Sequence, residues 1–471
     1  MKIMTIDGNE RDIAQDLIDG FKLKIKGQLL FPQDTLYNDS RTLWNAMIDR
    51  KPAMIVKCIG TADILAAVQF ARDNSLLMCI KAGGHNIAGL AAAEGGIMID
   101  LSLMRGVWVD KKNKIAHAQG GCLLGDIDRE TQLHGLAAVL GFVSQTGAAG
   151  LTLGGGFGYL TRRWGWTADN IAGMEIVTSD GKLIRANAKE NNDLFWGLRG
   201  GGGNFGVVSS IDYNLYEVGP EIIGGLIAWP AEESEKILKF FKQTADSAPE
   251  ELTMVAIIRP APPAPWLTKE WHFKPIIALL ACWSGNLEEG KKYLEPIKKF
   301  GKPIADIIIP RPYVQMNSLL DTANPKGRRY YWKSEYLPEL KDEMFKSFIT
   351  YGGKITSPFS AMILFQLGGA LNQLDETYSP AGNRAAQYVL NITSAWEKPE
   401  EDEQNISWAR DAWNEMKKFS TGGTYLNFLT EDDGKERTRY ALGNNLLRLK
   451  EIKTKWDKDN FFRMNWNITP L

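Results

Sequence analysis

The sequence predicts an α+β protein, and three features of its 471 residues support that prediction. The first is a β-α-β pattern, in which apolar, strand-like runs at 53–59 and 76–80 flank a helical pattern at 61–74. The second is a set of three glycine-rich runs in the first half of the chain. The third is the later half, where strands alternate with helices. Such alternation is typical of an antiparallel sheet with helices on one face.

The three glycine-rich runs lie at 81–86, 147–158 and 200–206. Glycine lets the backbone turn with positive φ and approach a ligand closely, so successive N–H groups can converge on an anion such as a pyrophosphate. The first run follows the second strand of the β-α-β unit, and such units bind ligands beyond the carboxyl end of a strand. We therefore expect one large phosphate-bearing ligand. His85 directly follows Gly83-Gly84 and is expected beside it.

The other elements follow from periodicity and turn residues. In the first half we expect helices at 13–21, 123–133 and 194–199, and strands at 96–101, 115–119, 174–178, 183–186 and 207–216, with a hairpin turn at Ser179-Asp180-Gly181. In the second half we expect helices at 232–241 and 288–300, and strands at 253–259, 275–283, 361–367 and 388–396. Glycine becomes rarer and helices longer after Glu217-Val218-Gly219-Pro220, which predicts a domain boundary there.

Composition excludes several functional classes. Lys and Arg number 55 and Asp and Glu 56, so the net charge of -1 gives no reason to expect nucleic acid or an anionic membrane as a partner. Cys58, Cys79, Cys122 and Cys282 lack metal-ligand spacing, and we expect free thiols and no metal site. The chain has no signal-like start and no run of about 18 apolar residues, so a soluble, cytoplasmic protein is expected.

Together with a block near the C-terminus, the glycine runs resemble the vanillyl-alcohol-oxidase and berberine-bridge-enzyme family of FAD-linked oxidases. The match covers Pro52 to Tyr216 and resumes at Asn445, Arg448-Leu449, Ile452-Lys453, Trp456-Asp457, Asn460, Phe462-Arg463, Asn465 and Asn467-Ile468. The resemblance implies a two-subdomain FAD-binding domain of the PCMH type. Residues 1–216 would form its first part, and 421–471 would complete it. Residues 217–420 would form an α+β substrate-binding domain with an antiparallel sheet.

The resemblance also implies that FAD is bound covalently, because His85 occupies the position that bonds to the flavin 8α-methyl group. Many members attach the flavin a second time through a cysteine. Val143 stands at that position here, which predicts a single attachment. Thr146 would lie beside the flavin C4a atom and influence oxygen access. The implied cofactor-binding residues are His85, Lys81, Ala82, Gly83, Gly84, Asn86, Ile87, Thr146, Gly147, Gly150, Leu151, Gly154, Gly156, Asn170, Gly206, Val208, Asn445, Asn465 and Asn467.

Three residues are candidates for catalysis. Tyr425 and Asn427 match a Tyr-x-Asn element that the family brings to the substrate side of the flavin, with Tyr425 as the base. The ordinary pKa of tyrosine is about 10, so a cation or the flavin would have to stabilise the phenolate. Lys333 is the candidate cation. The structural alternative is an aromatic core strand with a lysine that reaches solvent.

Several aromatic residues are candidates for a flat or carbohydrate-like substrate, although the core is the favoured place for each one: Trp164, Trp166, Tyr313, Tyr330, Tyr331, Trp332 and Phe365. The predicted function is an FAD-dependent oxidase that takes hydride from an alcohol, amine or sugar-type small molecule to flavin N5 and reduces oxygen to hydrogen peroxide. A dehydrogenase with another electron acceptor and a catalytically silent flavin protein stay open as alternatives. Substrate identity and assembly, including a homodimer, stay undetermined.

Overall fold

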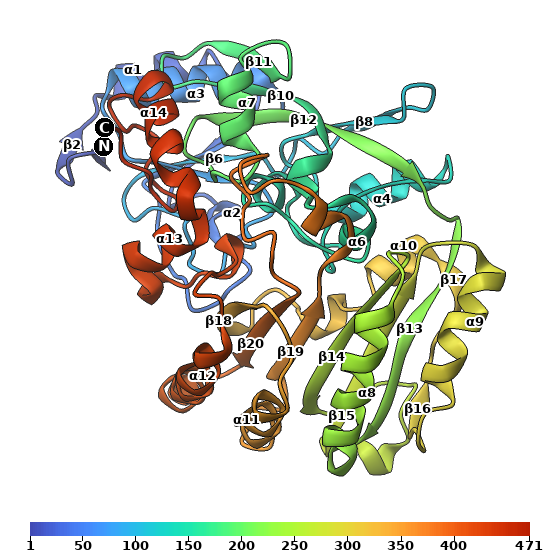
Figure 1. The fold of residues 1–471 in the computed structure, drawn as a ribbon. Helices are drawn as coiled ribbons and strands as arrows, with labels where there is room; N and C mark the ends of the chain where they lie inside the picture. Colours follow the sequence, from blue (N-terminus) through green and yellow to red (C-terminus); the bar gives the residue numbers. More distant parts are fainter.

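The computed structural model describes residues 1–471, which form two large lobes (Figure 1). The first lobe contains a four-stranded sheet in the order β3 (Gln28–Leu30), β4 (Met54–Lys57), β6 (Ile97–Asp100), β5 (Met78–Lys81). Strands β4 and β5 both run parallel to β6, and β3 is antiparallel to β4. Helix α3 (Thr61–Asp73) connects β4 to β5, which confirms the predicted β-α-β unit. The first glycine run begins where β5 ends.

A six-stranded antiparallel sheet forms the other part of the first lobe. Its order is β11 (Leu183–Asn187), β10 (Ile171–Val177), β12 (Val207–Glu217), β8 (Ile115–Gln119), β7 (Val107–Asp110), and β9 (Leu136–Ala138) also pairs with β12. The predicted hairpin is confirmed as β10 and β11. Four helices accompany this sheet: α4 (Leu124–Gln132), α5 (Ala148–Leu153), α6 (Thr161–Trp164) and α7 (Asn192–Leu198). Helix α5 lies within the second glycine run.

The two ends of the chain meet on the first lobe (Figure 1). The N-terminal elements are β1 (Lys2–Met4), β2 (Glu10–Asp12), α1 (Gln15–Lys22) and α2 (Tyr37–Arg41), and the C-terminal ones are α13 (Gly434–Leu442) and α14 (Leu446–Trp456). Leu449 and Ile452 of α14 pack with Phe205 in the core of the six-stranded sheet. The buried Lys453 ammonium pairs with Asp457 at 2.6 Å and donates to the Asn204 carbonyl at 2.6 Å. The last helix is thereby fixed to the third glycine run.

The second lobe is built on an eight-stranded antiparallel sheet. Its order is β16 (Ala305–Asp306), β13 (Glu221–Pro230), β15 (Pro275–Trp283), β14 (Leu252–Pro260), β19 (Ala361–Gln366), β20 (Tyr388–Trp396), β18 (Arg329–Leu337), and β17 (Ile309–Pro312) pairs with β13. The four strands that the sequence predicted here are β14, β15, β19 and β20. Strand β13 was not predicted; it is a nearly continuous apolar run interrupted by Gly224 and Gly225.

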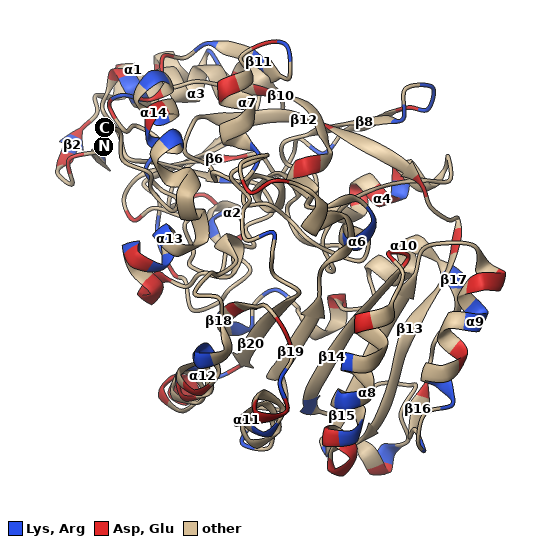
Figure 2. Ribbon diagram, in the orientation of Figure 1, with Lys and Arg blue, Asp and Glu red and all other residues tan.

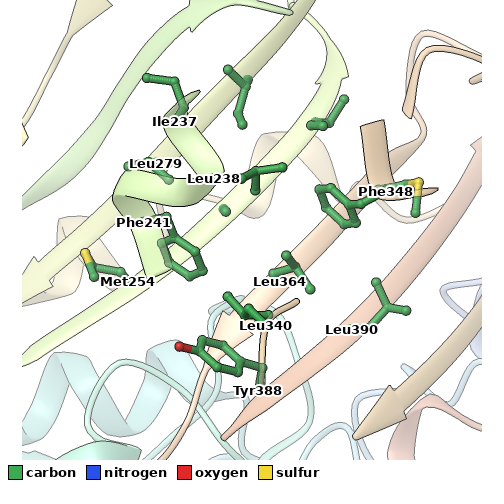
Figure 3. Packing of buried hydrophobic residues seen from close by; sticks show 14 of the residues in the cluster. Ile237, Leu238, Phe241, Met254, Leu279, Leu340, Phe348, Leu364, Tyr388 and Leu390 are labelled. Carbon is green, nitrogen blue, oxygen red and sulfur yellow. The ribbon is translucent and has the colours of Figure 1, made fainter. Parts of the chain in front are cut away.

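Helices cover one face of the large sheet. They are α8 (Ser234–Ser247), α9 (Leu287–Lys298), α11 (Asp342–Gly352) and α12 (Asp402–Met416), and a short α10 (Tyr313–Asn317) lies at the end that meets the first lobe (Figure 1). Phe241 of α8 and Phe348 of α11 pack onto strand side chains such as Leu364 (Figure 3). Charged residues lie along these helices and are sparse on the strands (Figure 2). Because side chains alternate along a strand, the other face of the sheet is available to the first lobe.

None of the helices combines the length and the apolar character that crossing a membrane requires. The four cysteines are buried and free, and no cluster of three or more His, Cys, Asp or Glu side chains could hold a metal ion.

Candidate active site

A large cavity lies where the two lobes and the C-terminal segment meet. Its wall contains most of the residues that the sequence implied for cofactor binding, from all three glycine runs and the last segment. These are Ala82, Gly83, Gly84, His85, Asn86, Thr146, Gly147, Gly150, Leu151, Gly154, Gly206, Val208 and Asn465. Tyr425 and Asn427 line the same cavity. Segments separated by more than 300 residues in the sequence therefore share one site.

The first two glycine runs touch each other through their backbones. A Cβ atom added to Gly83 would lie 2.5 Å from the Gly147 nitrogen, and one added to Gly147 would lie 2.6 Å from the Gly83 nitrogen. Nonbonded atoms of this kind prefer about 3.5–4.0 Å, so a side chain on either residue would force the loops apart. Gly84 has φ +67°, which L-residues rarely adopt. Glycine is therefore required at 83 and 147 because a side chain would not fit there. At 84 it is required because the backbone has a positive φ.

His85 presents a neutral imidazole to the cavity. Its Nε2 atom is buried and has no hydrogen-bond partner. Burial lowers the pKa of His85 to about 3, because removing the ring from water disfavours its charged form. The ring stacks on Trp44, with centroids 4.5 Å apart and planes inclined by 21°. A neutral imidazole has one ring nitrogen without a proton, and that nitrogen can bond to a ligand.

Tyr425 is a buried residue that lines the cavity. Its Oη accepts hydrogen bonds from the Gly156 N–H at 3.0 Å and from Asn427 Nδ2 at 2.8 Å. Burial raises the pKa of Tyr425 above its ordinary value, while these two donors act in the opposite direction by stabilising the phenolate. Asn427 is held in turn by donating to the Leu151 carbonyl at 3.1 Å. The predicted pair is thus connected to the second glycine run.

Lys333 does not reach Tyr425, which corrects the prediction that it supplies the cation. Its ammonium lies 2.9 Å from Asp432, 2.7 Å from Asp433 and 3.2 Å from the Thr430 hydroxyl. The reason is strand alternation in β18: Trp332 lines the cavity, so its neighbour Lys333 points to the other face of the sheet. No Lys or Arg side chain hydrogen-bonds the Tyr425 hydroxyl.

Six of the implied cofactor residues lie outside the cavity wall: Lys81, Ile87, Gly156, Asn170, Asn445 and Asn467. The Lys81 ammonium turns away to the Ser40 carbonyl at 2.8 Å and to Asp100 at 3.4 Å. The Asn170 amide donates to the Trp164 and Trp166 carbonyls. Gly156 acts through its N–H on Tyr425.

The roof of the cavity comes from the open face of the large sheet. Trp332, Ile363, Phe365, Asn391 and Thr393 line it, and the strand register places Ile363 opposite Asn391 and Trp332 opposite Thr393. Asn391 is buried, with 2% of the residue exposed, and its Oδ1 has no hydrogen-bond partner. Sequence reasoning missed Asn391 and Thr393. Their two-residue spacing within an apolar strand was the available signal, because it puts both polar groups on one face.

The predicted aromatic set divides between cavity and core. Trp332 and Phe365 line the cavity, whereas Trp164, Trp166, Tyr313, Tyr330 and Tyr331 do not. Val143 also lines the cavity, and none of the cysteines does. The wall contains no Asp, Glu, Lys or Arg, so its only ionisable side chains are His85 and Tyr425. A ligand here meets backbone amides, neutral polar groups and aromatic rings.

We expect Gly83→Ala to reduce the flavin content of the purified protein, because the added carbon would collide with the backbone of Gly147. Flavin absorbance per mole of polypeptide measures the effect. Gly20→Ala is the matched control, because nothing lies within 4 Å of a Cβ atom at that position. Equal flavin content in both variants would contradict the requirement for glycine at 83.

Comparison with known proteins agrees with this geometry. Residues 52–187 match the family described as FAD binding domain, and residues 424–469 match the family described as berberine and berberine like. A glucooligosaccharide oxidase from Sarocladium strictum is 34% identical over 467 residues, covering 91% of this chain and 90% of that protein. The (R)-6-hydroxynicotine oxidase of Paenarthrobacter nicotinovorans is 27% identical, covering 95% and 98%.

Among solved structures, 6-hydroxy-D-nicotine oxidase from Arthrobacter nicotinovorans superposes with a TM-score of 0.85 at 25% identity, covering 95% of this chain and 99% of that one. The segments that match the two family models contain the first two glycine runs and the Tyr425 and Asn427 pair, all of which contribute to the cavity wall. The chain therefore belongs to the berberine-bridge-enzyme-like family of FAD-linked oxidases, and it is an FAD-dependent oxidoreductase.

Proposed function

We propose that this protein is an oxidase that carries FAD covalently on His85, oxidises an uncharged, hydroxyl-bearing small molecule and releases hydrogen peroxide. Bound FAD would supply the redox chemistry, since its isoalloxazine accepts hydride from substrate and passes the electrons to oxygen. The residues of this chain would bind the cofactor, orient the substrate and exchange protons with it. A dehydrogenase that uses another acceptor is the alternative.

The observation that carries the proposal is a group of unpaired polar atoms around one cavity. His85 Nε2, Trp332 Nε1, Asn391 Oδ1, Asn465 Oδ1 and Trp466 Nε1 are all buried without partners, and all five residues line the wall. An unsatisfied buried polar group costs about 1–3 kcal/mol. A polar ligand that extends from the glycine runs to the sheet would satisfy these groups, and FAD together with a substrate has that character.

Two residues support attachment of FAD at a single point. They are His85, the predicted attachment point, and Val143, which stands where many relatives have a second attachment. His85 is neutral and its Nε2 is unpartnered, so a nitrogen lone pair needs no prior loss of a proton to become available. Val143 lines the cavity and has no nucleophilic atom. The glycine backbone at 83 and 147 would lie against the cofactor, where side chains would obstruct it.

Tyr425 is proposed to accept the substrate's hydroxyl proton as hydride leaves the adjacent carbon. Both of its hydrogen bonds are donated to Oη, from Gly156 and Asn427, and both stabilise a phenolate. Asn391 and Thr393 would position the hydroxyl-bearing part from the sheet above. The rings of Trp332 and Phe428, whose centroids lie 5.2 Å apart, offer apolar surfaces to the substrate's carbon skeleton.

The substrate is proposed to be uncharged because the wall offers no charged side chain, and the glycine N–H groups that could receive an anion would be used by the FAD pyrophosphate. Burying an isolated carboxylate or ammonium without a partner is costly, whereas neutral hydroxyl groups can pair with amide and hydroxyl side chains. A neutral alcohol or sugar fits these requirements. Two relatives are named as oxidases, one of glucooligosaccharides and one of 6-hydroxynicotine, which supports the choice of an oxidase over a dehydrogenase.

Acid denaturation of the purified protein should leave the yellow colour in the precipitate, because the bond to His85 survives unfolding. His85→Ala should release all of its flavin under the same treatment. His134→Ala, which changes a histidine outside the cavity wall, is the control and should retain the colour. Complete release from the wild-type protein would exclude covalent attachment.

With oxygen as the sole acceptor, neutral sugars or alcohols should yield one hydrogen peroxide per substrate oxidised. For a matched pair such as a sugar and its uronic acid, we expect kcat/KM to be lower for the acid by about tenfold or more, because the wall has no cation to pair with it. Peroxidase-coupled assays measure both. Flavin bleaching by substrate that oxygen fails to reverse would favour the dehydrogenase instead.

Tyr425→Phe should lower kcat by roughly 10²- to 10⁴-fold, the usual contribution of a positioned acid or base. In the wild-type enzyme kcat/KM should rise with pH by up to about tenfold per unit below the tyrosine pKa, because burial keeps that pKa above its ordinary value. The phenylalanine variant should lose this dependence. Tyr440→Phe, at an exposed tyrosine, serves as control. An unchanged pH profile in Tyr425→Phe would assign the base to another group.

A further inference from the structure

We propose that Trp44 is a positioning residue that sets the His85 imidazole for attachment to FAD, and that it makes attachment depend on docking of the second lobe. This inference rests on the proposed covalent link at His85. It adds a residue that lies 41 positions earlier in the chain and outside the three glycine runs.

The stack on Trp44 is the contact that orients the His85 ring. No hydrogen bond holds its Nε2, and the tryptophan plane lies 21° from the imidazole plane at a centroid distance of 4.5 Å. Trp44 is itself 2% exposed, and its backbone N–H donates to the Gly84 carbonyl at 3.0 Å. The ring that faces His85 is thereby fixed to the loop that carries His85.

The second lobe holds the other face of Trp44. Tyr330 of β18 stacks on it with centroids 3.6 Å apart and planes inclined by 12°. Trp44 Nε1 donates to the Asn324 carbonyl at 2.9 Å, and the Tyr330 hydroxyl donates to the Pro325 carbonyl at 2.6 Å. Trp44 therefore lies between the proposed nucleophile and the edge of the large sheet.

The next residue, Asn45, ties the same two elements together. Its Nδ2 donates to the Ile87 carbonyl and to the Tyr330 carbonyl, each at 3.0 Å, and its Oδ1 accepts from the Tyr330 N–H at 3.0 Å. Residues 44 and 45 thus connect the backbone on both sides of His85 to β18. The orientation of His85 consequently depends on both lobes being docked.

Orientation matters because the bond forms between two positioned atoms. As the imidazole nitrogen bonds to the flavin methyl carbon, one proton leaves that carbon and one leaves the imidazole, and the remaining electron pair reduces oxygen to hydrogen peroxide with two protons. The angle and distance of the ring govern the rate of such a step, and a displacement of about 1 Å can cost roughly 10²-fold.

The test measures the fraction of bound flavin that stays with the polypeptide after acid denaturation, at successive times of expression, with intact mass as a second readout. Trp44→Ala should bind flavin but form the covalent bond about 10- to 100-fold more slowly. Trp44→Phe, which keeps an aromatic face, should restore most of the rate. Tyr330→Leu, which does not touch His85, should also slow attachment.

Trp108→Ala is the matched control, because Trp108 stacks on His117 with centroids 4.9 Å apart and planes inclined by 20°, outside the cavity wall. It should attach flavin at the wild-type rate. Wild-type attachment in Trp44→Ala would overturn the role of Trp44, and wild-type attachment in Tyr330→Leu would overturn the dependence on docking. Noncovalent flavin in the wild-type protein would instead contradict the proposed function itself. If Trp44→Ala fails to fold, Trp44→Leu takes its place, because it keeps apolar volume but removes the aromatic face that stacks on His85. It should slow attachment, and wild-type attachment in this variant would overturn the role of Trp44.

Discussion

The backbone contact between Gly83 and Gly147 is the constraint on which the rest of the site depends. It joins the loop that follows β5 to the loop before α5, and neither residue has room for a side chain. This contact holds together the two loops that carry His85 and Thr146, both of which line the cavity. The packed cores on either side allow little adjustment, since protein interiors transmit displacement rather than absorb it.

Charged side chains are absent from the cavity wall and form ion pairs elsewhere. Ion pairs are placed behind the wall: Lys81 with Asp100, Lys333 with Asp432 and Asp433, and Arg384 with Asp169. A buried ion pair contributes little net stability, but loss of one partner leaves an expensive unpaired charge. The chain thus uses charges to hold segments together and keeps the cavity surface neutral, where His85 and Tyr425 are both shifted toward their uncharged forms.

Local patterns were enough to predict the β-α-β unit, the β10–β11 hairpin and the glycine loops, because each depends on neighbours in the sequence. The resemblance to a family added Tyr425 and Asn427, which the structure places in the cavity. The resemblance gave the wrong role for Lys333, because a matching motif does not show on which face of a strand a side chain lies. Strand alternation decides that question, and it sends Lys333 to the helix side. Asn391 was missed because only docking of the lobes brings it to the site, and Trp44 because a tertiary contact outside the glycine runs places it beside His85.

The parts of the cavity come from segments that lie far apart in the chain. Residues between 82 and 208 line one part of its wall, whereas Tyr425 and Asn465 come from the last segment, which packs on the first lobe. Lys453 secures that packing by donating to the Asn204 and Phe462 carbonyls and pairing with Asp457. Without this packing, the cavity would lack Tyr425, the proposed base. Formation of the active site is therefore coupled to completion of the fold, because its proposed base and its proposed attachment point lie on segments joined only by tertiary contacts.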